Sequence, residues 1–135
     1  MDQPRTPLSV IKEALADAET RFFLRKKRCQ LKLNEAGVAE DRQVDFARAV
    51  VSSLARTNFG WIADCDDHFE YDAYAVTLSA AFLQQHEIDV RKTTWYVGIQ
   101  FKEDTNGSII AVVSLHRLEK VFHYANGSTP LKPAW

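Results

Sequence analysis

Three side chains suited to phosphate chemistry lie on two neighbouring segments near the end of the chain. Tyr96 belongs to a run at 94–101, and His116 and Arg117 close a second run at 108–117. Breaking a phosphate ester without a metal requires a base, a cation for the negative charge and an acid for the leaving oxygen. An imidazole titrates near neutral pH, and a guanidinium binds two phosphate oxygens at once. Together with a phenol, these groups can fill the three roles of base, cation and acid.

The two runs predict a β-hairpin that brings these side chains together. Both runs alternate apolar and polar residues, and they flank Asn106-Gly107, which is a strong hairpin signal. Because strand side chains alternate between faces, one face is expected to be core. It carries Trp95, Val97, Ile99 and Phe101. The opposite face carries Tyr96, Gln100 and Lys102. Antiparallel pairing about the turn then places Tyr96 beside His116 and Arg117.

Each of these residues also has an ordinary structural interpretation. Aromatic residues favour strands, so Tyr96 alone could fill space on a sheet. His116 could be a hydrogen-bonded sheet histidine and Arg117 a surface cation. Their predicted convergence favours a functional role over these structural interpretations. His68, on the turn of another expected hairpin, is a second candidate proton donor.

No metal or cofactor site is expected. Asp66-Asp67-His68 offers ligand types, but consecutive residues on a tight turn rarely converge on one ion, so a solvated loop is favoured. Cys29 and Cys65 lack CxxC spacing and are interpreted as free thiols without chemistry.

Composition indicates one soluble domain spanning residues 1–135. The chain has 46% hydrophobic and 26% charged residues, and its net charge of −1 excludes a globally basic nucleic-acid binder. Local patches must therefore carry any contact with a nucleic acid, and Arg91, Lys92 and Lys102 are candidates near the hairpin. The cluster at 25–32 either guides an RNA backbone or forms a solvated helix face. Neither a membrane span nor an apolar leader is visible, which predicts a cytoplasmic protein.

The order of elements predicts the α+β class, with helices packed on one face of a small antiparallel sheet. Helical spacing begins near Ser9, the expected N-cap, and extends to Phe22. The further elements expected are helices at 25–37, 41–54 and 78–91, strands at 61–63 and 69–76, the hairpin, and a flexible tail at 125–135.

The same order and local residues resemble the MqsR family of bacterial toxins, within the RelE-like group of small ribonucleases. Four pieces carry the resemblance: 5–12, 50–59, 67–74, and 95–99 with 113–117. The resemblance implies a RelE-like fold and a cytoplasmic toxin of a type II toxin–antitoxin system. Such a toxin is a metal-independent endoribonuclease that cleaves single-stranded mRNA to a 2′,3′-cyclic phosphate and is held inactive by a cognate antitoxin protein.

Two departures from the family pattern bear on activity. Trp61 stands where the family has a functional lysine, and Tyr71 stands where it has a glutamine. Aromatic side chains at these positions can stack RNA bases, so both are candidate RNA contacts. The loss of the family side chains also leaves an alternative open. In it, the chain is a non-catalytic RelE-like binding module, or a phage-encoded or immunity-type inhibitor, that acts by protein–protein interaction.

Overall fold

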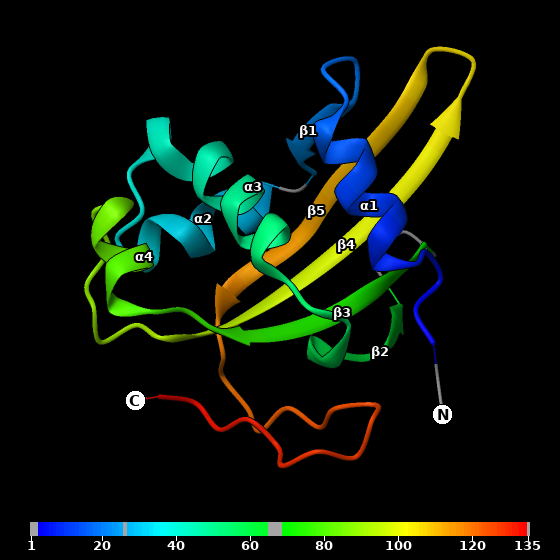
Figure 1. The fold of residues 1–135 in the computed structure, drawn as a ribbon. Coiled ribbons are helices and arrows are strands. Elements are labelled where there is room, and N and C mark those ends of the chain that lie inside the picture. The colour runs from blue at the N-terminus through cyan, green and yellow to red at the C-terminus, as the bar shows by residue number, and fades with distance from the viewer. Residues whose placement is uncertain (1–2, 26, 65–68, 135) are drawn as a thin grey trace.

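A five-stranded mixed sheet organises the chain (Figure 1). The structure is a computed structural model, and it describes residues 3–25, 27–64 and 69–134. The strand order is β1-β5-β4-β3-β2. The strands are β1 (Arg21–Leu24), β2 (Phe59–Asp64), β3 (Glu70–Thr77), β4 (Thr94–Asp104) and β5 (Gly107–Arg117). The α+β class is therefore confirmed.

The sheet is not purely antiparallel as expected, because β1 pairs with β5 in parallel. Residues 21–24 were expected to end or follow the first helix. Instead α1 ends at Ala16, and Arg21 to Leu24 pair with Ile109 to Val112. A four-residue strand is too short to show an alternating pattern of its own, and its partner lies more than 80 residues away in the chain.

The helices follow the local signals with shifted ends. They are α1 (Leu8–Ala16), α2 (Lys27–Glu35), α3 (Gln43–Ser53) and α4 (Ala80–Gln85), with 3₁₀ turns at Glu40–Arg42 and Arg56–Asn58. Pro7 rather than Ser9 occupies the N-cap of α1. The expected helix at 78–91 is shorter because Glu87 adopts a left-handed conformation with φ of 59°, which ends α4.

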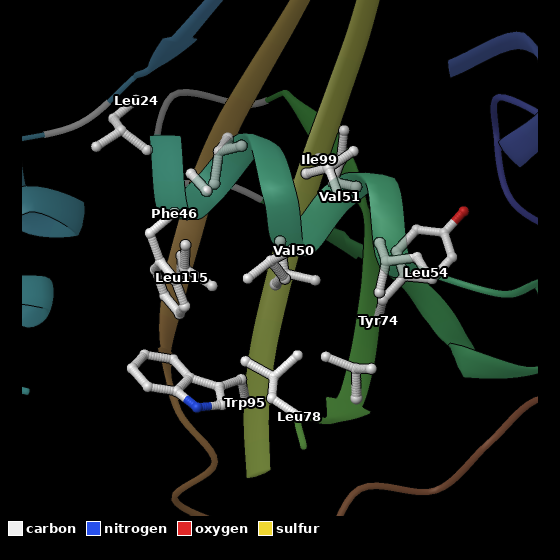
Figure 2. Close-up of a cluster of buried hydrophobic side chains, with 14 of the residues drawn as sticks. Leu24, Phe46, Val50, Val51, Leu54, Tyr74, Leu78, Trp95, Ile99 and Leu115 are labelled. Atoms are coloured by element: carbon white, nitrogen blue, oxygen red, sulfur yellow. The ribbon is translucent and has the colours of Figure 1, made fainter. Parts of the chain in front are cut away.

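The main core lies between the sheet and the helices (Figure 2). Phe46 and Val50 of α3, and Leu54 just after it, point onto β3, β4 and β5, where Trp95 and Leu115 meet them. These five side chains are fully buried. Burying a side chain of this size stabilises the fold by about 1.5–3 kcal/mol, so the α3 face is a major source of stability.

The C-terminal segment, residues 118–134, packs on the opposite face of the sheet (Figure 1, orange to red). Phe122 is 1% exposed and packs with Ala73 and Ala75 of β3. Gly60 makes this possible, since a Cβ there would overlap the Phe122 ring. The described part of the expected flexible tail, residues 125–134, is tied to the sheet by two hydrogen bonds: Ala125 N to Phe59 O, 3.0 Å, and Ala134 N to Thr94 Oγ1, 2.9 Å.

None of the helices in the described ranges combines the length and the apolar character needed to cross a membrane.

Candidate functional site

Tyr96 and His116 lie directly opposite each other on β4 and β5, as expected from the predicted hairpin. Their rings stack with centroids 5.0 Å apart and an interplanar angle of 16°. Both project from the face opposite the main core, because their neighbours Trp95, Val97 and Leu115 point into it. The pairing register alone is enough to bring the phenol and the imidazole together.

The backbone sets the orientation of the His116 ring. Its Nδ1 lies 2.7 Å from the Arg117 carbonyl oxygen. A carbonyl oxygen only accepts, so Nδ1 carries the proton and donates it, and in the neutral ring Nε2 retains a lone pair. That nitrogen is the one available to act as a base.

A second phenol adjoins the pair. The hydroxyls of Tyr71 and Tyr96 lie 2.9 Å apart and share one hydrogen bond. Gly98 makes room for the Tyr71 ring, because a Cβ at that position would overlap it. Burial, followed by the hydrogen bond with Tyr71, raises the pKa of Tyr96 above its ordinary value of 10.0. Both effects favour the protonated phenol, so Tyr96 can donate a hydrogen bond but does not serve as a base at neutral pH.

The raised Tyr96 pKa predicts a loss of stability in alkali. The unfolded chain releases the phenolic proton near pH 10 while the folded chain retains it, so this contribution is fully present below pH 10 and is lost as pH rises toward the folded pKa. Urea unfolding at pH 8 to 11 should therefore show a decreasing free energy of unfolding. Between pH 10 and 11, Tyr96→Phe should lessen this decrease by about 1 kcal/mol. A pH dependence unchanged by Tyr96→Phe would contradict the assignment. Some decrease should remain, because burial also raises the pKa of Tyr74.

Helix α2 forms the other wall of a groove beside these residues. β1 pairs with β5 only as far as Val112, and α2 contacts β5 as well. Cys29 and Leu33 of α2 are buried in the core, whereas Arg28 and Lys32 line the groove. We call this feature the α2–β5 groove. It consists of an upper hollow of about 270 Å³, which includes Tyr71, Tyr96 and His116, and a lower hollow of about 310 Å³.

Arg117 does not join Tyr96 in the upper hollow. It lies opposite Trp95, and successive strand residues face opposite sides, so its side chain leaves the sheet on the other face from His116. Arg117 instead lines the lower hollow, together with Lys32 and His116. Partial burial lowers its pKa, with Glu119 acting in the opposite direction.

Lys32 provides the cation beside His116 that had been assigned to Arg117. Its Nζ lies 2.8 Å from Oε1 of Glu119, and the same oxygen lies 3.8 Å from His116 Nδ1. The hydrogen bond from Lys32, and then the charge of His116, hold the pKa of Glu119 below its usual value. Sequence reasoning noted Lys32 only as part of a basic helix and did not identify Glu119.

Three of the candidate RNA contacts lie outside both hollows. Arg91 is ion-paired with Asp89 at 2.6 Å. Lys92 donates to the Ala36 carbonyl at the end of α2. Lys102 lies over the Phe69 ring, 4.1 Å from its centroid.

The two aromatic candidates lie nearer the site. Tyr71 lines the upper hollow. Trp61 is 38% exposed and stacks on Phe122 at 4.5 Å, with its centroid 6.3 Å from that of Tyr96. The fourth catalytic candidate, His68, falls outside the described residues.

The groove offers neither a reactive thiol nor an evident metal centre. Burial raises the pKa of Cys29 to about 11, so this thiol stays protonated at neutral pH. Within the described ranges, no three His, Cys, Asp or Glu side chains gather closely enough to hold a metal ion.

Comparison with known protein families and with curated proteins finds no match to this chain.

Proposed function

We propose that the chain is a metal-independent endoribonuclease that cleaves single-stranded RNA in the α2–β5 groove. The observation that supports this most strongly is the stacked pair of Tyr96 and His116 beside the Lys32 ammonium. A base, a proton donor and a cation thereby line one hollow of about 270 Å³. The resemblance to MqsR extends the proposal to a RelE-like fold, to mRNA as substrate and to a toxin that an antitoxin restrains.

In the proposed reaction, Nε2 of His116 removes the proton from the RNA 2′-hydroxyl. The 2′-oxygen attacks the adjacent phosphorus, the bond from phosphorus to the 5′-oxygen breaks, and a 2′,3′-cyclic phosphate remains. Lys32 stabilises the additional negative charge of the phosphorane. Each such contribution from acid–base or electrostatic catalysis typically accelerates a reaction by about 10²–10⁴-fold.

The tyrosine pair supplies the remaining proton. Two phenols contain two O–H groups, and their mutual hydrogen bond uses one of them, so one O–H is left to donate outward. That phenol protonates the leaving 5′-oxygen and recovers a proton from the imidazolium of His116. Burial keeps Tyr96 protonated before the reaction begins.

A cleavage assay tests the proposal. The purified protein should cut single-stranded RNA in excess EDTA, and mass spectrometry should find 2′,3′-cyclic phosphate ends. Induction in bacteria should arrest growth. RNA that stays intact, while an active ribonuclease run alongside cuts it, contradicts the enzymatic claim.

A non-catalytic binding module is the second candidate, and the charges of the upper hollow favour it. Arg28 and Lys32 are balanced there by Asp64 and Glu119, so the described lining has little net charge to attract RNA. Trp61 and Tyr71 also replace the lysine and glutamine of the resembled family. Growth arrest that persists in a His116→Ala variant would favour this candidate, since protein binding does not require the imidazole.

A further inference from the structure

An ion pair crosses the α2–β5 groove where its two hollows share lining residues. Lys32 on α2 and Glu119, just beyond β5, are joined at 2.8 Å, and both side chains line the upper and the lower hollow. His116 lines both hollows as well, 3.8 Å from the same carboxylate oxygen. A polynucleotide strand bound along the groove must therefore pass this ion pair.

The carboxylate of Glu119 has the surroundings of a bound phosphate. One of its oxygens accepts a charge-assisted hydrogen bond from Lys32 and lies near an imidazole. Arg28 lines the same hollow and adds a second positive charge. A phosphodiester presents the same kind of anionic acceptor, and ammonium groups bind it as point charges.

We infer that Lys32, beside His116, forms a phosphate-binding position for a single-stranded polynucleotide, and that Glu119 occupies this position in the free protein. The inference rests on the proposed function. Replacement of the Glu119 carboxylate by a phosphate needs only a rotation of the Glu119 side chain. The backbone beside it stays in place, because Leu118 N donates a hydrogen bond to Thr94 O. The Glu119 side chain is 54% exposed and can turn toward solvent.

The inference predicts that Glu119→Gln binds nucleic acid more tightly. The probe is a fluorescently labelled single-stranded DNA octamer, which lacks the 2′-hydroxyl and is not cut by this route. Fluorescence anisotropy should give a dissociation constant about fivefold lower than that of the wild type. The dependence of log K on log salt should stay close to that of the wild type, because the strand contacts Lys32 in both proteins. Lys32→Gln should weaken binding and make the slope shallower by about 0.7, which corresponds to the loss of one phosphate contact on a single strand.

Asp104→Asn is the matched control. It removes the same charge from another exposed ion pair, with Arg21 at 2.9 Å, near the turn of the β4–β5 hairpin. Tighter binding by Glu119→Gln alone supports the inference. Equal tightening by both variants would assign the effect to net charge and overturn it, as would wild-type affinity in Glu119→Gln.

This experiment can fail separately from the proposed function. The octamer reports binding only. A gain in affinity by Glu119→Gln without RNA cleavage by the wild type would support the phosphate-binding position and contradict the endoribonuclease proposal. RNA cleavage by the wild type without any gain in affinity by Glu119→Gln would support the endoribonuclease proposal and contradict the phosphate-binding position.

Discussion

His116→Ala is expected to slow RNA cleavage by about 10²–10⁴-fold, because it removes the proposed base. The test is single-turnover cleavage of a labelled RNA in EDTA. Phe substitutions at Tyr71 and Tyr96 should each be less damaging than His116→Ala, since in either case the remaining phenol keeps an O–H.

The fold should survive this substitution. The His116 side chain is 22% exposed and its ring stacks on one neighbour, so truncation leaves no sealed cavity in the core. His123→Ala is the control, since His123 is exposed on the C-terminal segment and lines neither hollow. Cleavage at the wild-type rate by His116→Ala, or an equal loss in His123→Ala, would contradict the assigned role.

Phe122→Ala is expected to lower the free energy of unfolding by about 3–5 kcal/mol. Phe122 is 1% exposed, stacks on Trp61 and packs edge-on against Tyr124 at 5.2 Å. Removing the ring leaves a cavity between the C-terminal segment and the sheet. Urea unfolding followed by tryptophan fluorescence measures the loss, and the stacking on Trp61 makes the emission sensitive to it.

Val121→Ala provides the comparison for Phe122→Ala. Val121 precedes Phe122 in the chain but is 45% exposed, so its truncation should change the free energy of unfolding by about 0.5 kcal/mol or less. A loss below 1 kcal/mol for Phe122→Ala would mean that the C-terminal segment does not pack against the sheet in solution.

Local sequence patterns were sufficient to predict those helices and strands whose geometry depends on neighbouring residues in the chain. The alternating runs about Asn106-Gly107 predicted the hairpin and assigned Trp95 and Tyr96 to opposite faces. The apolar spacing of α3 likewise predicted the helix that covers the core. β1 could not be found in this way, because a short parallel strand is defined by a distant partner.

The site was predictable only where strand register determines it. Tyr96 and His116 meet because pairing about the turn requires it. Arg117 was misplaced because adjacent strand residues cannot share a face. Lys32 and Glu119 meet across 87 residues of chain, through the docking of α2 against β5, and no local spacing encodes that contact.

The most direct test of the α2–β5 groove as the RNA site is an NMR titration of the protein with a single-stranded RNA octamer that carries 2′-O-methyl sugars throughout and is therefore not cut by this route. The predicted result is that the His116 imidazole signals and the backbone amides of Lys32, Tyr71, Tyr96 and Glu119 shift together and saturate at one equivalent. Shifts confined to other surfaces, with the His116 signals unchanged at saturation, would contradict the account.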